Sequence, residues 1–315
     1  MAIVANTFTT YDAQGVREQW DDVIFNIAPT DTPFQSGIGK GKATNIYFWW
    51  QTDSLAGAAN NAQLDGDDVS AFTAVNPTSK VIGTCQISRK TLVISASEQA
   101  VLKAGRKDEV AYQTMLKVKE LKRDIETALC QNTTSVAGTT TTARQTRGLE
   151  GWVATNNSLA TVGTPGVAPN PTTNTAPTDG TQRAFTEALL KSVCQTIYTA
   201  GGDPDMLMVG PGQKQVVSTF TGNATRMKDA KDGELQSAIS VYTSDFGTFK
   251  IAPNRFQRNR TAFLLQTDMW KLMTLRPLQV VDMAKTGDAD KKLMTWEYGL
   301  QANQEASGGA IRDLT

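Results

Sequence analysis

The chain has 315 residues, of which 40% are hydrophobic, and its 31 lysines and arginines balance 31 aspartates and glutamates. This length supports a sizeable core, whereas zero net charge argues against a dedicated nucleic-acid binder, which needs a basic excess to release counterions from phosphates. Because the chain has no histidine, it cannot build a Ser-His-Asp or Cys-His catalytic arrangement, and we do not expect an enzyme.

The cysteines and the N-terminus indicate the compartment. Cys85, Cys130 and Cys194 lie far apart with no Cys-x-x-Cys spacing, so we expect buried reduced thiols rather than disulfides or a zinc site. Residues 1–10 contain neither a positive region nor an apolar run, and no stretch is apolar enough to span a membrane. We therefore expect no signal peptide, no metal, no cofactor and no membrane partner, with the chain made in a cytoplasm.

Residues 1–40 are predicted to form an extended arm with one short helix at 12–25. The stretch 28–34 ends this helix, because it contains two prolines. Trp20 and Phe34 are large apolar residues with no obvious local core around them. We therefore expect the arm to need a partner surface.

Residues 41–95 are predicted to form two strands, at 44–51 and 80–94, joined by a long polar connection. The first strand carries aromatic residues on both faces, so both faces are expected to meet protein. These aromatic residues include Phe48, Trp49 and Trp50. The connection contains the acidic cluster Asp65, Asp67 and Asp68. A loop of this length is uncommon inside a compact domain, which favours a projecting hairpin whose tip rests on another surface.

Residues 97–131 give the strongest helix signal in the chain. Apolar residues recur there at spacings of three and four, which predicts one buried stripe. The opposite face carries Lys117, Lys119, Lys122 and Arg123. A run of charges of this kind is usually a solvated face.

The second half of the chain is predicted to be mixed. Residues 132–181 are rich in Thr, Asn, Pro and Gly and favour surface loops, above all at 154–180. Residues 181–275 alternate helix and strand, which predicts an α+β module. Residues 276–315 are predicted to be strands, with a clear period of two over 294–301 and a returning strand at 310–314.

No motif predicts catalysis. Residues 37–42 are rich in glycine and lysine but lack the phosphate-loop pattern. The acidic cluster lacks the spacing of a calcium loop, so a solvated turn is the simpler interpretation. Glu297 has no recognisable partner carboxylate, and an outward position on its strand is expected. Trp49 and Trp50 suit base or sugar stacking, but core or subunit packing is favoured, because Ile46 and Phe48 adjoin them and no basic cluster does.

The order of the predicted elements resembles a known family. An arm, a projecting hairpin, one long helix, an α+β module and closing strands resemble the major capsid protein of tailed bacteriophages, the Hong Kong 97-type fold. The sequence is also similar to podovirus-type major head proteins. The segments that carry this similarity are Asp-Thr-Pro-Phe at 31–34, Trp-Trp-Gln-Thr-Asp-Ser-Leu-Ala at 49–56, Arg-Gly-Leu at 147–149, Gly-Gly-Asp-Pro-Asp at 201–205, and Glu297, Leu300, Asn303 and Ala306 to Gly309.

The resemblance implies an α+β fold with four parts. These are an N-terminal arm at 1–40, an extended loop at 41–95, a peripheral domain with a spine helix at 96–135 and 276–315, and an axial domain at 136–275. The implied function is self-assembly, as hexamers and pentamers, into the icosahedral head shell around the double-stranded DNA genome. Intersubunit contacts are then expected from Trp20, Phe34, Phe48, Trp49, Trp50, Asp65, Asp67 and Asp68. Weak interior contact with DNA is expected from Lys117, Lys119, Lys122 and Arg123.

The resemblance also implies partners. A portal protein and a decoration protein are expected in a phage head, and a separate scaffolding protein is expected because this sequence begins directly with the arm. Some relatives join subunits through a Lys–Asn isopeptide bond from the extended loop. Here residues 57–73 contain Asn60 and Asn61 but no lysine, so no such covalent cross-link is expected.

Other function classes stay open at this point. A bacterial encapsulin-type nanocompartment has the same fold and predicts packaged enzyme instead of a portal and a genome. A phage tail or adhesion component predicts trimers or tubes. A carbohydrate-active enzyme, with carboxylates and stacking tryptophans, predicts a small oligomer and turnover of a sugar.

Overall fold

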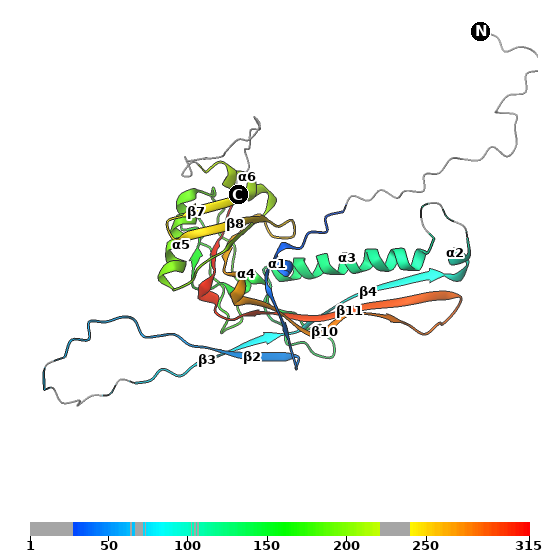
Figure 1. Ribbon diagram of the computed structural model, residues 1–315, viewed down its shortest axis with the longest axis horizontal. Coiled ribbons are helices and arrows are strands. Elements are labelled where there is room, and N and C mark those ends of the chain that lie inside the picture. Colours follow the sequence, from blue (N-terminus) through cyan, green and yellow to red (C-terminus); the bar gives the residue numbers. More distant parts are fainter. Residues whose placement is uncertain are drawn as a thin grey trace, which may run out of the picture.

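The computed structural model of the chain describes residues 28–63, 65–66, 72, 74–101, 103, 105, 107–220 and 240–315. Two sheets, one long helix and a projecting hairpin make up this α+β fold (Figure 1). The helix expected at 12–25 lies outside the described residues. Among the described residues, no helix has the length and apolar character needed to cross a membrane.

The first sheet has four strands and lies along the long helix. Its order is β1 (Gly39–Lys42), β10 (Trp270–Asp282), β11 (Ala289–Ala302) and β4 (Gln86–Ser95), with β1 parallel to β10 and the other pairs antiparallel. The helix α3 (Glu109–Cys130) is capped by Asp108, whose side chain accepts a hydrogen bond from the Ala111 amide. Its predicted stripe is confirmed, since Leu121, Ile125 and Leu129 are fully buried. The short α2 (Ala96–Ala100) precedes it.

The predicted second strand at 80–94 is divided between two sheets. β3 (Ser79–Thr84) pairs with β2 (Tyr47–Thr52) to form the hairpin, whereas β4 enters the four-stranded sheet. The division falls at Cys85, which is fully buried and whose amide donates to the Ile46 carbonyl at 2.9 Å. The hairpin therefore grows directly out of a strand of the body.

The second sheet has six strands and is the α+β module predicted for the later part of the chain. Its order is β5 (Asn157–Ser158), β12 (Gly309–Ile311), β9 (Ala262–Leu265), β6 (Met206–Val209), β8 (Gly247–Pro253) and β7 (Val241–Ser244). Its helices are α5 (Glu187–Thr199) and α6 (Pro211–Ser218). The remaining elements are α1 (Pro33–Gly37), α4 (Leu149–Trp152) and the 3-10 turns η1 (Thr267–Met269) and η2 (Glu305–Ser307).

The C-terminal strand differs from its prediction. Residues 310–314 were expected to return onto the strand at 294–301, but β12 pairs with β9 and β5 in the other sheet. The physical reason is burial, because Ile311 and Leu314 are both fully buried in the apolar core of the six-stranded sheet. The last residues of the chain thus complete the second sheet.

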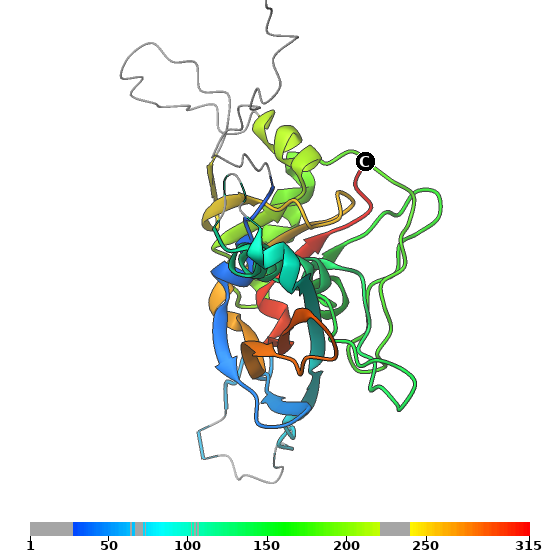
Figure 2. The same cartoon turned by 90° about the vertical axis from the view of Figure 1, so that its right-hand side faces the viewer.

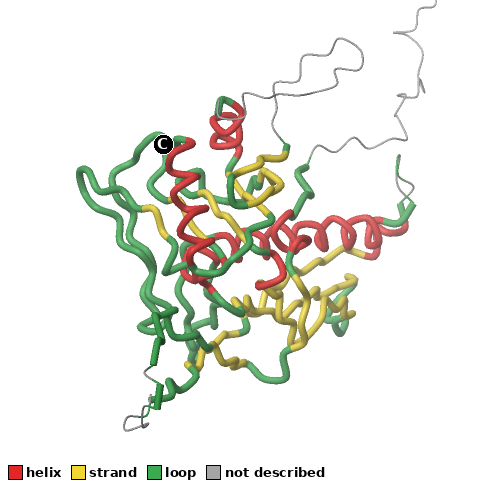
Figure 3. The backbone as a smooth tube through the Cα atoms, turned by 60° about the vertical axis from the view of Figure 1, so that its left-hand side comes forward, coloured by secondary structure: helices red, strands yellow, loops and turns green. Residues whose placement is uncertain are grey.

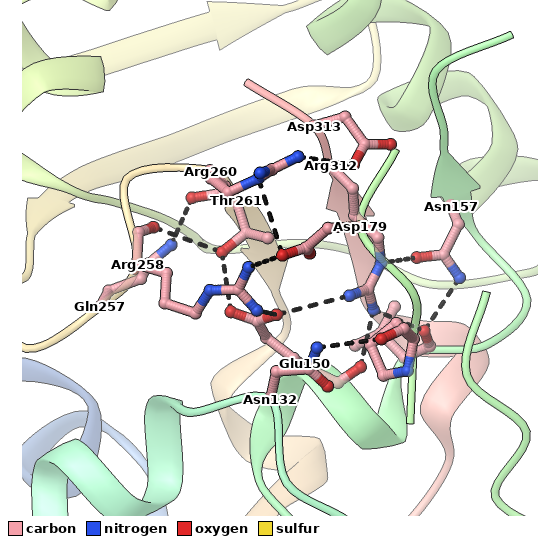
Figure 4. Close-up of polar contacts among 12 residues, drawn as sticks. Asn132, Glu150, Asn157, Asp179, Gln257, Arg258, Arg260, Thr261, Arg312 and Asp313 are labelled. Carbon is pink, nitrogen blue, oxygen red and sulfur yellow. Dashed lines mark hydrogen bonds and ion pairs between the residues drawn. The ribbon is translucent and has the colours of Figure 1, made fainter. Parts of the chain in front are cut away.

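A buried ionic cluster holds the C-terminal segment to the loops around it (Figure 4). The Glu150 carboxylate is fully buried and lies 3.1 Å from Arg258 Nη1 and 3.8 Å from Arg312 Nη1. Arg312 Nη2 also donates to the Glu150 carbonyl at 2.7 Å. Burial raises the pKa of Glu150, and the two guanidinium groups oppose this shift. The cluster joins α4 to Arg312, the residue directly after β12, across more than half of the sequence.

Candidate assembly surfaces

The β2–β3 hairpin presents one apolar face to the body and one to the outside. Its register pairs Phe48 with Gly83, Trp49 with Ile82, and Trp50 with Val81. Since side chains alternate along a strand, Phe48 and Trp50 share the inner face and Trp49 lies on the outer one. Phe48 and Trp50 stack at 5.8 Å between ring centroids, and Trp50 contacts Trp152 at 5.5 Å.

The residues expected at subunit contacts fall into separate groups. Phe34 is fully buried against Trp270, with ring centroids 6.3 Å apart, and Phe48 is 8% exposed. Both side chains therefore stabilise the subunit itself and leave almost no surface for a neighbour. Trp49 is 50% exposed, and Asp65 is exposed as well. Trp20, Asp67 and Asp68 lie outside the described residues.

The described residues of the connection between the hairpin strands lie away from any core. Residues 53–63 are exposed throughout, and Leu55 is 99% exposed. Phe72 and Val75 are 88% and 91% exposed. Covering such a side chain with protein contributes about 1.5–3 kcal/mol. Asp65 and Gly66 form a turn in this connection, with Gly66 at a φ of +79° that glycine adopts readily.

A groove of about 510 Å³ lies along the outer face of the hairpin. Two long loops, 132–147 and 160–180, form its other wall, and they lie together on one side of the molecule (Figure 3). Its lining includes Tyr47, Trp49, Lys80, Ile82, Ser135, Arg147, Pro171 and Asn174. The Lys80 Nζ atom sits 3.2 Å from the centroid of the Trp49 ring, a cation–π contact.

Arg147 is the most unusual residue of this groove. It is 5% exposed, its guanidinium lies 4.4 Å from the Trp152 ring centroid, and Nη2 donates to Pro171 O at 2.9 Å and to Asn174 Oδ1 at 2.8 Å. Within the described residues it has no carboxylate partner, and its buried Nη1 has no hydrogen-bond partner. Burial lowers the pKa of Arg147 to about 10, so it stays charged at neutral pH. A single arginine in a loop gave no sequence signal for this role.

The basic face of α3 is partly neutralised. Lys117 Nζ lies 2.9 Å from Glu120 Oε2. Lys119 and Lys122 are exposed and Arg123 is half-buried, and none of the three has a carboxylate partner among the described residues. The structure thus leaves three of the four predicted cations available to a ligand.

Glu297 is a correction to the sequence-based prediction. It was expected to point outward from its strand, but it is 3% exposed and lies 2.6 Å from Arg144 Nη2 and 2.7 Å from Arg276 Nε. The two arginines provide the countercharge that makes its burial tolerable. Within the described residues, no group of three or more acidic or cysteine side chains could hold a metal ion. Cys85, Cys130 and Cys194 are free and buried.

Comparison with known proteins identifies the family. Residues 3–315 match the family described as SU10 major capsid protein. The major capsid protein of Escherichia phage Phieco32 is 28% identical over an alignment 346 positions long, which covers 96% of each chain. The capsid of cyanophage A-1(L) superposes with a TM-score of 0.69 at 13% identity over 98% of both chains, and a chain of Mycobacterium phage Adephagia gives 0.63 at 11% identity over 99% of both.

These likenesses confirm the resemblance drawn from the sequence. The solved structures show that the α+β fold is that of phage capsid proteins. The family match extends over nearly the whole length of the sequence. The chain therefore belongs to the SU10 major capsid protein family.

Proposed function

We propose that this major capsid protein of a tailed phage assembles as hexamers and pentamers into an icosahedral head shell around double-stranded DNA, and that it catalyses no reaction. The observation that supports this most directly is the exposed apolar surface of the hairpin and its connection, above all Trp49, Leu55 and Val75. Monomeric soluble proteins rarely leave such a surface open. Contacts between different patches of identical chains close into rings when the rotation permits, and such rings would cover it.

The two sheets support an assignment of domains. We assign α3 and the four-stranded sheet to the peripheral domain, with α3 as its spine helix, and the six-stranded sheet to the axial domain. The pairing of β12 supports extending the axial domain to the C-terminal residues. The hairpin and its connection would be the extended loop resting on an adjacent subunit, and the residues before α1 would belong to the N-terminal arm.

Further partners follow from the same proposal. The same chain must occupy both five-fold and six-fold positions, and a scaffolding protein is the kind of partner that selects between them. We propose this partner together with a portal protein and a decoration protein, with assembly in the host cytoplasm. Lys119, Lys122 and Arg123 on α3 would make weak, sequence-independent contacts with packaged DNA.

The experiment compares two adjacent tryptophans. Trp49→Ser removes an exposed ring from the outer face, so the purified chain should keep its melting temperature but form few closed shells in electron micrographs. Trp50→Ser removes a ring that packs on Trp152 and should lower the melting temperature. A wild-type chain that forms no shells, alone or with a scaffolding protein, would contradict the proposed function. Normal shells from Trp49→Ser would contradict the role of the hairpin.

A further inference from the structure

The groove beside the hairpin has the chemistry of a docking site. Strand alternation places Tyr47 and Trp49 of β2 on the same outer face as Lys80 and Ile82 of β3. The two loops on the opposite side of the groove add Pro171 and the polar residues Ser135, Thr172 and Asn174. The result is a concave surface with aromatic and aliphatic walls at the root of a projecting element.

The charges of the groove are all of one sign. Lys80 and Arg147 line it, and no aspartate or glutamate does. Lys80 is exposed, whereas Arg147 is 5% exposed and has no carboxylate partner in the described part of the chain. Burying a cation without a countercharge is costly, and a carboxylate that arrives from outside would offset that cost. The groove therefore suits an acidic ligand with apolar side chains.

The hairpin connection of another copy has this composition. Residues 53–78 contain four aspartates, at 53, 65, 67 and 68, with no lysine or arginine, and they also contain Leu55, Phe72 and Val75. Asp65 lies at a turn near the midpoint of this segment. Thirteen extended residues on each side reach at most about 45 Å, which is the scale of a neighbouring subunit.

A second copy is the better source of this ligand than the same chain. The groove lies at the root of the hairpin, and the described residues 53–63 run away from that root (Figure 1). An extended hairpin cannot bring its own tip back to its root. In a ring of subunits, by contrast, every root can receive the tip of the next copy, so each contact is repeated around the ring.

We infer that, in the shell assembled as proposed above, the acidic segment around Asp65, Asp67 and Asp68 of one copy docks into the groove of an adjacent copy. The carboxylates pair with the exposed Lys80 of the receiving copy and offset the charge of the buried Arg147 that lines the same groove. Apolar side chains of the same segment pack against Trp49 and Ile82. This inference rests on the proposed function and adds the receiving surface to it.

Engineered disulfides test the contact directly. Cysteine replaces Asp65, Asp67 or Asp68 in turn, each together with Ile82→Cys, and the assembled shells are oxidised. The three native cysteines are at most 1% exposed, so background cross-linking should be low. Docking predicts a ladder of covalent oligomers on a non-reducing gel, because a disulfide forms only when the two Cα atoms approach to about 7 Å. The control pairs each tip cysteine with Val241→Cys, which lies on the edge strand β7 and is 51% exposed.

The outcomes separate this inference from the function. A ladder from at least one tip position with Ile82→Cys, and none with Val241→Cys, supports docking. Intact shells with no ladder from any pair, or with equal ladders from both sites, overturn the docking while leaving the shell function in place. A wild-type chain that never assembles overturns the proposed function itself.

A charge exchange gives a second measurement. Lys80→Glu in the groove, or the three substitutions Asp65→Lys, Asp67→Lys and Asp68→Lys in the tip, should each lower the yield of shells at least about tenfold, because like charges then meet. Arg147 is left unchanged, since its burial would confuse assembly with folding. Combining both sets should restore most of the yield. A combined variant that assembles no better than the single sets overturns the inference.

Discussion

Buried carboxylates join segments that are distant in the sequence. Glu126 on α3 is fully buried and accepts hydrogen bonds from the Phe34 and Gln35 amides and from Asn254 Nδ2, each at 2.8 Å. The residue at the start of α1 makes no side-chain capping bond, so this glutamate satisfies the first amides of the helix instead. Glu126 therefore fixes α1 to α3.

The titration of Glu126 should show in the stability of the subunit. Burial raises the pKa of Glu126 above its usual 4.5, although its hydrogen bonds oppose the shift. A raised folded pKa means that its contribution is fully present below the unfolded pKa and is lost as the pH rises through the folded pKa. Glu126→Gln does not titrate, so the free energy of unfolding of the wild type minus that of the variant should fall between pH 4.5 and neutral pH. Urea unfolding across this range measures it, and a flat or rising difference would contradict the assignment.

Glu150 should be far more sensitive to substitution than a surface carboxylate. Glu150→Ala leaves Arg312, which is 3% exposed, without its countercharge and should cost about 3–5 kcal/mol of unfolding free energy. Asp290→Ala is the control, because Asp290 pairs with Lys285 on the surface and should change stability little. Denaturant unfolding of both variants tests this. Equal losses of unfolding free energy from the two substitutions would show that the buried cluster contributes no more to stability than a surface ion pair.

At the scale of elements, the ring of Phe48 packs between two glycines and holds the hairpin against the four-stranded sheet. A Cβ atom added to Gly83 would lie 2.3 Å from Cζ of Phe48, and one added to Gly299 would lie 2.7 Å from Cε1 of the same ring. Gly83 is the cross-strand partner of Phe48, while Gly299 belongs to β11 beneath it. These glycines permit the close approach that fixes the hairpin to the four-stranded sheet.

Gly83→Ala should therefore loosen the hairpin. The added methyl group forces the Phe48 ring to move, at a cost of about 1–3 kcal/mol for overpacking. Gly57→Ala is the matched control, because nothing lies within 4 Å of its added Cβ atom. Thermal unfolding gives the cost, and Phe48→Leu in the Gly83→Ala background should recover part of it. If Gly83→Ala and Gly57→Ala have the same melting temperature, the packing of the Phe48 ring does not hold the hairpin in place.

The sequence predicted element types better than element partners. Strict alternation predicted the strand that became β11, and spacing predicted the buried stripe of α3. Alternation also put Trp49 and Trp50 on opposite faces of the strand. Because both faces carry aromatic residues, the pattern could not show which face packs against the body. The pairing of β12 depends on strands distant in sequence, and the role of Arg147 depends on two loops meeting around it. Local pattern contains neither piece of information.

At the scale of the whole molecule, the net charge is zero but the charged residues are unevenly distributed. The hairpin connection is acidic, whereas Lys119, Lys122 and Arg123 lie together on α3. Seen end-on, α3 lies above the four-stranded sheet and the hairpin below it (Figure 2). The basic and acidic surfaces are therefore available to different partners. This separation allows a neutral chain to contact its neighbours through one surface and phosphates through another.

Contact with DNA should be weak and should depend on few charges. At most three cations of α3 lack carboxylate partners in the described structure, so the logarithm of the binding constant of the unassembled chain for a short duplex should fall with the logarithm of salt concentration with a slope no steeper than about −3. Replacing Lys119, Lys122 and Arg123 by glutamine should bring the slope close to zero. Lys191→Gln, on a helix of the other sheet, should leave it unchanged. A much steeper slope, or one that the triple variant retains, would place the DNA-binding surface elsewhere on the subunit.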